Sequence, residues 1–160
     1  MPATIDDALA LVVARFRGVT DKDGQPYVLH CLRVMLDVVG PLAQQVAVMH
    51  DLVEDTDVTI EDLQQFGFAE EVVAGVRLVT HLPSDSYAEY VVRLKPDPLA
   101  RQVKLADLRD NYSLKRVAFR EDKVAEDLRR IQRYMLSYQF LSDHLDETSY
   151  RQRMSGVEDD

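Results

Sequence analysis

Residues 41–55 read PLAQQVAVMHDLVED, and this stretch decides the fold class. Its large apolar residues recur at intervals of four and three, at Leu42, Val46, Met49 and Val53. That spacing places them on one face of an α-helix, whereas the apolar residues of a half-buried strand alternate every second position. The stretch therefore predicts a helix, although it is rich in valine.

The rest of the chain follows the same helical period. The valines at 72, 73, 76 and 79 repeat it, and Gly40-Pro41 ends one helix and opens the next, because proline suits a first helical turn. We find no alternating stretch and no internal repeat. The sequence predicts an all-α fold, a single compact helical bundle, with helices at about 4–17, 27–39, 41–55, 59–66, 69–81, 85–95, 97–118 and 120–145.

Length and composition are those of one folded domain. The chain has 160 residues and 18.3 kDa, with 46% hydrophobic and 29% charged residues. Residues 149–160 show no clear apolar periodicity and end in three acidic residues. We therefore expect one folded domain over residues 1–148, no room for a second catalytic domain, and a flexible acidic tail over residues 149–160.

Charge and cysteine content restrict the function classes. The net charge of −9 opposes general attraction to nucleic acid or to anionic lipid. Residues 93–133 nevertheless hold 12 Lys and Arg against 7 Asp and Glu, which leaves room for a local site for a small polyanion. A lone Cys31, no apolar run long enough to cross a membrane and no export signal predict a cytoplasmic protein without nucleic-acid or membrane partners. A homo-oligomer is conceivable, but the periodicity does not locate its surface.

Residues 49–57, MHDLVEDTD, carry more acid than a stable helix end needs. Carboxylates at a helix C-terminus oppose the helix dipole, and Asp51 and Asp55 form a like-charge pair at i, i+4. A bound cation would reverse the sign of both effects. The structural alternative is a solvated acidic turn with His50 as a hydrogen-bonded histidine.

Two further positions favour the metal interpretation. His30 lies within the apolar stretch 27–35, where it is either a satisfied core histidine or a ligand. Asp107 shares a helix face with Lys104 and Asn111, which alone is most often a surface arrangement. Side chains from different helices of a bundle can converge in its interior. Two imidazoles and two carboxylates form a mixed set suited to Mn, Fe or Zn rather than Ca: His30, His50, Asp51 and Asp107.

Four ordered blocks carry a family resemblance. They are DKDGQPYVLH at 21–30, HDLVEDT at 50–56, LVT at 78–80 and KLAD at 104–107. With them the chain resembles the HD-domain metal-dependent phosphohydrolases, and more closely the hydrolase domain of the RelA/SpoT enzymes and their small stand-alone relatives.

The resemblance implies a metal-dependent enzyme that hydrolyses the 3′-pyrophosphate of guanosine 3′,5′-bis-pyrophosphate, or of a similar nucleotide, and releases pyrophosphate. It implies one ion, usually Mn²⁺, on the four residues just given. By the same matching, Glu54 and Asp55 handle the attacking water, and the substrate contacts are Lys22, Lys104 and Asn111.

Some positions depart from the family pattern. Asp21 stands where the long enzymes carry an arginine, and Leu108-Arg109-Asp110 stands where Arg-Leu-His is more common. Two alternatives therefore stay open: a phosphatase acting on another nucleotide, and a catalytically silent module that senses a nucleotide.

Outside the motifs, the default interpretations are ordinary packing for the aromatic pair Tyr87 and Tyr90, and a solvated helix face for Arg129, Arg130 and Arg133.

Overall fold

The computed structural model describes residues 2–113 and 121–158, and almost all regular structure within them is helical. Within these ranges, one isolated bridge pairs Thr20 with Pro26. The all-α prediction is confirmed. The helices are α1 (Ile5–Arg15), α2 (Val28–Leu36), α3 (Pro41–Val48), α4 (Leu52–Asp55), α5 (Ile60–Gln65), α6 (Glu70–Val79), α7 (Tyr87–Leu94), α8 (Pro98–Asn111), the 3₁₀ turn η1 (Glu121–Lys123), α9 (Val124–Leu141) and α10 (Glu147–Glu158).

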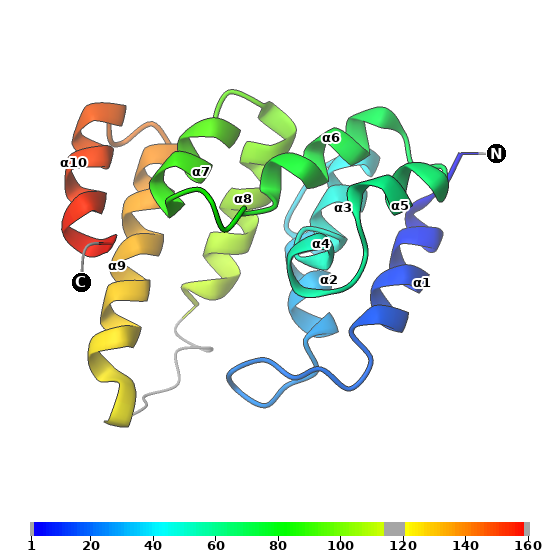
Figure 1. The fold of residues 1–160 in the computed structure, drawn as a ribbon, viewed down its shortest axis with the longest axis horizontal. Helices are drawn as coiled ribbons and strands as arrows, with labels where there is room; N and C mark the ends of the chain where they lie inside the picture. The colour runs from blue at the N-terminus through cyan, green and yellow to red at the C-terminus, as the bar shows by residue number, and fades with distance from the viewer. Residues whose placement is uncertain (1, 114–120, 159–160) are drawn as a thin grey trace.

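Helix α3 lies at the centre of the core, in contact with α1, α2, α6 and α8 (Figure 1). Ala43 and residues 45–48 are buried, and only the start of the helix is exposed, which explains a composition of small apolar residues without charge. Helix α6 crosses it closely at Gly75, where an added Cβ would lie 2.8 Å from Cγ2 of Val46. Glycine at this position therefore sets the distance between the two helices.

The predicted helix over residues 41–55 is interrupted. Helix α3 ends at Val48 and α4 begins at Leu52, so that His50 and Asp51 occupy a turn. Asp51 has φ −100° and ψ 0°, in the sparsely populated bridge region of backbone space. The Nδ1 atom of His50 donates to the carbonyl oxygen of Ala47 at 2.8 Å and satisfies one acceptor at the end of α3. The break thus presents two motif residues toward the neighbouring helices.

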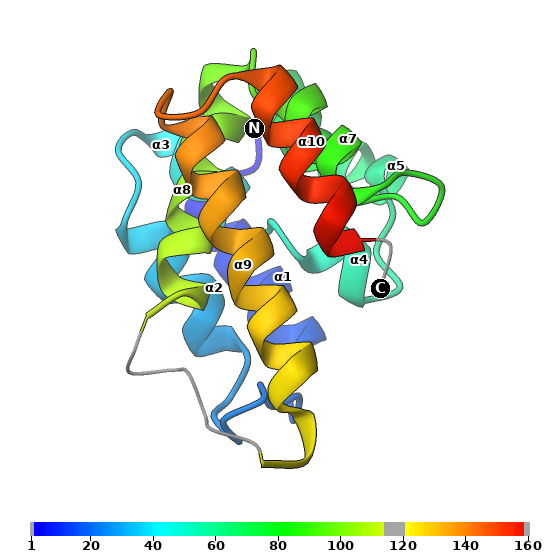
Figure 2. The same ribbon diagram turned by 90° about the vertical axis from the view of Figure 1, so that its left-hand side faces the viewer.

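The expected flexible tail over residues 149–160 is wrong for its described part, which forms α10. Tyr150, Met154 and Val157 are buried, and the ring of Tyr150 stacks on Phe140 with centroids 4.5 Å apart. The spacing of these three residues, four and three, is a helical period that the polar residues between them concealed. The packing of α10 on α9 is visible in Figures 1 and 2.

Helix α8 connects two groups of helices. It contacts α2, α3 and α6 on one side and α9 on the other, while α7 packs on both α9 and α10. The site described below is lined by residues from both groups. Helix α8 ends at Asn111, and residues 114–118 of its predicted extent fall outside the described residues. None of the described helices is long and apolar enough to cross a membrane.

Candidate metal centre and active site

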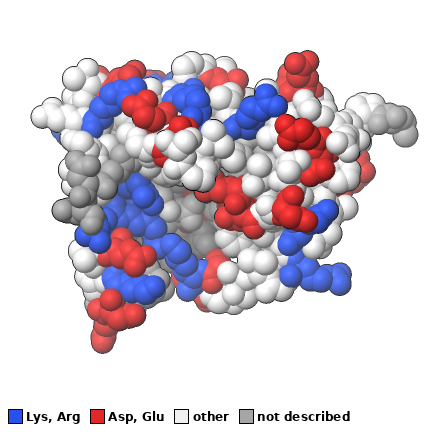
Figure 3. All heavy atoms as spheres, viewed as in Figure 1, with Lys and Arg blue, Asp and Glu red and all other residues white. Residues whose placement is uncertain are grey.

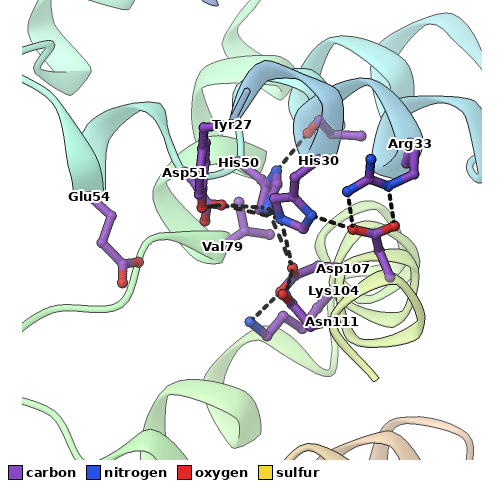
Figure 4. Close-up of polar contacts among 12 residues, drawn as sticks. Tyr27, His30, Arg33, His50, Asp51, Glu54, Val79, Lys104, Asp107 and Asn111 are labelled. Atoms are coloured by element: carbon purple, nitrogen blue, oxygen red, sulfur yellow. Dashed lines mark hydrogen bonds and ion pairs between the residues drawn. The ribbon is translucent and has the colours of Figure 1, made fainter. Parts of the chain in front are cut away.

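Four of the predicted site residues meet at one point, and they come from three parts of the fold. His30 lies on α2, His50 and Asp51 in the turn between α3 and α4, and Asp107 on α8 (Figure 4). The Nε2 atoms of the two histidines are 3.1 Å apart. Oδ2 of Asp51 is 2.9 Å from Nε2 of His50, and Oδ1 of Asp107 is 3.3 Å from Nε2 of His30. We call these four side chains the ligand cluster.

Hydrogen bonds on the far side of each imidazole decide what the facing nitrogens can do. Nδ1 of His50 donates to the Ala47 carbonyl, and Nδ1 of His30 donates to Oδ2 of Asp110 at 2.6 Å. A neutral imidazole with its proton on Nδ1 has a lone pair on Nε2. When both rings are neutral, two such lone pairs and two carboxylates face one another, an arrangement of acceptors that a cation stabilises.

The spacing of the donor atoms fits a single ion. Ligands bonded at about 2.0–2.2 Å to one ion lie roughly 2.9–3.5 Å from each other, at tetrahedral or octahedral angles. The four nitrogen and oxygen pairs within the ligand cluster lie between 2.9 and 3.5 Å apart. His30, His50 and Asp107 each offer one atom within 4.8 Å of the others, a donor set and spacing that suit a divalent metal ion, and Asp51 adjoins this group through both histidines.

The pKa values of the cluster show how negative the site is. Burial lowers the pKa of a histidine, yet the surrounding carboxylates raise the pKa of His30 to about 11 and that of His50 to about 9. Burial raises the pKa of Asp107, but the ammonium of Lys104 and hydrogen bonds from both histidines hold it well below its usual range. The site favours positive charge and keeps its carboxylates ionised.

Asp107 is held by two residues that the sequence analysis assigns to the substrate. Lys104 donates to Oδ2 at 2.7 Å, and Asn111 donates to Oδ1 through Nδ2 at 2.5 Å. All three lie on one face of α8, as their spacing predicts. Lys104 is buried, and the contact with Asp107 helps to raise its pKa against the effect of burial. The contacts indicate that Lys104 and Asn111 fix the Asp107 carboxylate.

The predicted water-handling pair stands beside the ligand cluster rather than in it. Glu54 and Asp55 are exposed on α4 and line the same cavity (Figure 4 shows Glu54). Oε2 of Glu54 accepts a hydrogen bond from the backbone N–H of His81 at 3.0 Å. Burial and then the charges of Asp51 and Glu54 raise the pKa of Asp55. Both carboxylates thus line the cavity that holds the ligand cluster and are open to a small molecule.

A cavity of about 490 Å³ contains the site. Lys22 lies on its edge, in a loop that Asp21 closes by accepting hydrogen bonds from the backbone N–H groups of Asp23 and Gln25. Asp21 thus has a role in the loop itself. In Figure 3, acidic side chains lie to one side of a central hollow and basic side chains to the other.

The side of the cavity opposite the ligand cluster is built by α7 and α9. Arg130 and Arg133 of α9 and Tyr87 of α7 line it, and we call these three side chains the basic wall. The guanidinium of Arg133 lies 4.6 Å from the ring centroid of Tyr87. Among the described residues, Nη1 of Arg130, Nε of Arg133 and the hydroxyl of Tyr87 are buried and have no hydrogen-bond partner. Unpartnered buried donors are costly, so a site that holds an anion explains them.

The basic wall corrects two sequence interpretations. Arg130 and Arg133 are not part of a solvated face, and Tyr87 and Tyr90 do more than pack, because all four line the cavity. Periodicity places the arginines on α9 but cannot show which helix faces α9.

The sequence analysis also missed the contacts behind the ligands. The Tyr27 hydroxyl donates to Oδ2 of Asp51 at 2.5 Å, and Asp110 supports His30. Asp110 is three residues from Asp107 on α8, and this spacing predicts that the two residues share a helix face. The spacing was therefore the sequence signal that could have identified Asp110 as part of the site.

Comparisons with known proteins agree with the fold and the motifs. The chain is 32% identical over 114 residues, 64% of its length, to an Aquifex aeolicus protein named guanosine-3′,5′-bis(diphosphate) 3′-pyrophosphohydrolase. A Vibrio cholerae protein of the same name is 33% identical over 62% of the chain, and a Streptomyces coelicolor GTP pyrophosphokinase is 34% identical over 66%. The matches cover 16%, 16% and 14% of these relatives, respectively. No protein-family profile matches the chain.

A solved structure described as a metazoan ortholog of SpoT that hydrolyzes ppGpp has the same fold. It superposes with a TM-score of 0.60 over 96% of this chain and 97% of its own, at 22% sequence identity. The resemblance to RelA/SpoT-type hydrolases, predicted from four short blocks, is therefore confirmed in sequence and in fold.

Proposed function

We propose that this protein hydrolyses guanosine 3′,5′-bis-pyrophosphate, or a closely similar nucleotide, at its 3′-pyrophosphate and releases pyrophosphate. The observation that carries the proposal is the convergence of the ligand cluster inside a cavity whose opposite side holds half-buried arginines. A cation site facing an anion site suits a substrate with several phosphate groups. The names of the relatives point to the same reaction.

His30, His50, Asp51 and Asp107 would hold one divalent ion. We assign Mn²⁺, because the mixed nitrogen and oxygen set suits Mn, Fe or Zn and the family that the chain resembles usually holds Mn²⁺. When bound, the ion lowers the pKa of water and neutralises charge on phosphoryl oxygens. The hydrogen bonds on Nδ1 orient both rings so that each Nε2 atom faces the ion and, in the neutral ring, gives it a lone pair.

Glu54 and Asp55 orient the attacking water and accept its proton. Both line the cavity that holds the ligand cluster. The raised pKa of Asp55 makes its carboxylate a better proton acceptor than an ordinary aspartate. The backbone N–H of His81 fixes one oxygen of Glu54, which leaves the other oxygen to bind water. The reaction is a direct displacement and needs no covalent intermediate.

The cationic side chains position the phosphate groups. Lys22 and Lys104 line the cavity on the side of the ligand cluster, and Arg130 and Arg133 line the opposite side. A phosphate between the two walls gives the unpartnered guanidinium nitrogens and the Tyr87 hydroxyl an acceptor.

Because Cys31 is buried and unpaired, the protein has no need of an oxidising compartment, and we place the reaction in the cytoplasm.

An activity assay tests the proposal. The purified protein is incubated with guanosine 3′,5′-bis-pyrophosphate and Mn²⁺, and the products are identified by chromatography and mass spectrometry. We expect a guanosine nucleotide that has lost its 3′-pyrophosphate, together with one equivalent of pyrophosphate. An excess of chelator should stop the reaction, and added Mn²⁺ should restore it.

The same assay separates the alternatives. Release of orthophosphate from simple nucleotides, with the bis-pyrophosphate left intact, would identify a nucleotide phosphatase instead. Tight nucleotide binding without turnover, in the presence of Mn²⁺, Fe²⁺ or Zn²⁺, would identify a sensing module and contradict the proposal.

A further inference from the structure

Asp110 lies directly behind one of the proposed metal ligands. Its Oδ2 atom is 2.6 Å from Nδ1 of His30, whose Nε2 atom points into the ligand cluster (Figure 4). A carboxylate can only accept in this contact, so the proton of the imidazole must sit on Nδ1. The side chain of Asp110 is 11% exposed and that of His30 is 2% exposed. The contact is therefore largely shielded from water, which strengthens it.

Arg33 holds Asp110 in place. Its Nε atom donates to Oδ1 at 2.6 Å and its Nη2 atom to Oδ2 at 3.2 Å, so the guanidinium contacts both oxygens of the carboxylate. This bidentate pair fixes the plane of the carboxylate as well as its charge. Arg33 lies one turn of α2 after His30, at i+3. Arg33, Asp110 and His30 thus form a chain of contacts that ends at the ligand cluster.

A second ion pair joins the same two regions without touching the site. Arg109 of α8 donates through Nε to Oδ2 of Asp37, the residue after α2, at 2.6 Å. Both partners of this pair are more than 40% exposed. It connects α2 to α8 as the Arg33–Asp110 pair does, yet it contacts no ligand. An exposed ion pair is thus enough to connect α2 to α8, and this connection does not require a carboxylate buried against His30.

We propose that Asp110, clamped by Arg33, is a positioning residue that sets the tautomer and orientation of His30 for metal binding. The inference rests on the proposed function, because it takes His30 as a ligand. A carboxylate behind a ligating histidine also increases the basicity of the ring. Asp110 is the third residue of Leu108-Arg109-Asp110, which stands where Arg-Leu-His is more common in the family that the chain resembles. The carboxylate behind His30 is therefore a feature of this chain's own sequence.

Metal titration of matched variants tests the proposal. The metal-free protein and its variants Asp110→Ala, Asp110→Asn, Arg33→Met and Asp37→Asn are titrated with Mn²⁺ in a calorimeter, and each is unfolded by heat in the presence of chelator. Asp110→Ala should weaken Mn²⁺ binding about 10- to 100-fold. Asp110→Asn keeps an acceptor for Nδ1 of His30 but loses the charge that binds Arg33, so it should recover part of that loss. Arg33→Met should weaken binding less than Asp110→Ala does.

The control separates positioning from general support. Asp37→Asn removes the Arg109–Asp37 ion pair between α2 and α8 and should leave the Kd for Mn²⁺ within twofold of the parent value. If Asp110→Ala and Asp37→Asn bind Mn²⁺ equally well, or if Asp110→Asn is as weak as Asp110→Ala, the positioning role is wrong. If the parent protein itself does not bind Mn²⁺, Fe²⁺ or Zn²⁺, the proposed function fails first, and this result is distinct from the other two.

Discussion

The two sides of the cavity differ in how far the protein satisfies its own polar groups. On the side of the ligand cluster, each imidazole and each carboxylate has a protein partner, and a further layer that includes Tyr27, Lys104 and Asp110 holds those groups in place. On the basic wall, buried donors of Arg130, Arg133 and Tyr87 have no partner among the described residues.

This difference separates two ways of building a site. The ligand cluster is organised in advance, because converging ligands repel one another and must be held by the surrounding protein. The basic wall keeps cations in a partly buried place, where their unpartnered donors cost free energy until an anion arrives. We therefore expect changes in the ligand cluster to abolish function, and changes in the basic wall to weaken substrate binding by a graded amount.

The largest effect on turnover should come from His50→Gln. Glutamine is similar in length, but it cannot reproduce the contact with Ala47 and offer a nitrogen lone pair to the cluster at the same time. We expect loss of Mn²⁺ binding and a fall in kcat/KM of about 10³-fold or more, since a metal ion contributes several kcal/mol. Calorimetry and steady-state assays measure the two quantities. A variant that binds Mn²⁺ normally would remove His50 from the ligand set.

Glu54→Gln should be the next most damaging change. The amide cannot accept the proton of the attacking water, and general-base contributions are typically about 10²- to 10⁴-fold. We expect kcat to fall by that range while KM and the affinity for Mn²⁺ stay close to the parent values. Glu61→Gln, on the exposed side of α5, is the matched control and should leave kcat unchanged. A Glu54→Gln variant with full turnover would disprove the role in water handling.

Smaller and graded effects are expected on the basic wall. Arg130→Met and Arg133→Met should each raise KM about 10-fold, because a hydrogen bond to a charged group contributes roughly 1.5–3 kcal/mol. Mn²⁺ affinity should not change. Arg129→Met is the control, since Arg129 lies on the same helix, is exposed and does not line the cavity. Equal KM values for all three variants would show that α9 does not contact the substrate.

The smallest effect on turnover should come from Tyr150→Ala, which tests the packing of α10. Tyr150 is fully buried, stacks on Phe140 and shares a hydrogen bond with Ser137. We expect a loss of about 3–5 kcal/mol in the free energy of unfolding. At temperatures where the variant stays folded, kcat and Mn²⁺ affinity should stay the same. Gln152→Ala, an exposed position on the same helix, should leave stability unchanged. Stability equal to the parent in Tyr150→Ala would restore the expectation of a loose tail.

Much of the fold could be predicted because helical periodicity is a local property. The spacing of Val72, Val76 and Val79 is enough to predict α6. The break between α3 and α4 could not be predicted in this way, because Met49 and Val53 continue the period across it. The excess of acidic residues around Asp51 was the sequence signal that this segment is not selected for helix stability alone.

The candidate site could be predicted in part. The ligand cluster was identified from residue types that a stable helix would not select, together with motif order. The basic wall required knowledge of which helix faces α9, and this depends on tertiary contacts far apart in the sequence. Arg133 and Tyr87 are neighbours in space but lie on different helices, and no periodicity within either helix predicts their contact.

Crystals of the protein grown with Mn²⁺ provide the most direct test of the account. Anomalous diffraction at the manganese edge should reveal one peak per chain, bounded by the Nε2 atoms of His30 and His50 and by the carboxylates of Asp51 and Asp107. No peak between those four side chains, or a peak elsewhere in the cavity with these groups bonded only to one another, would contradict the account.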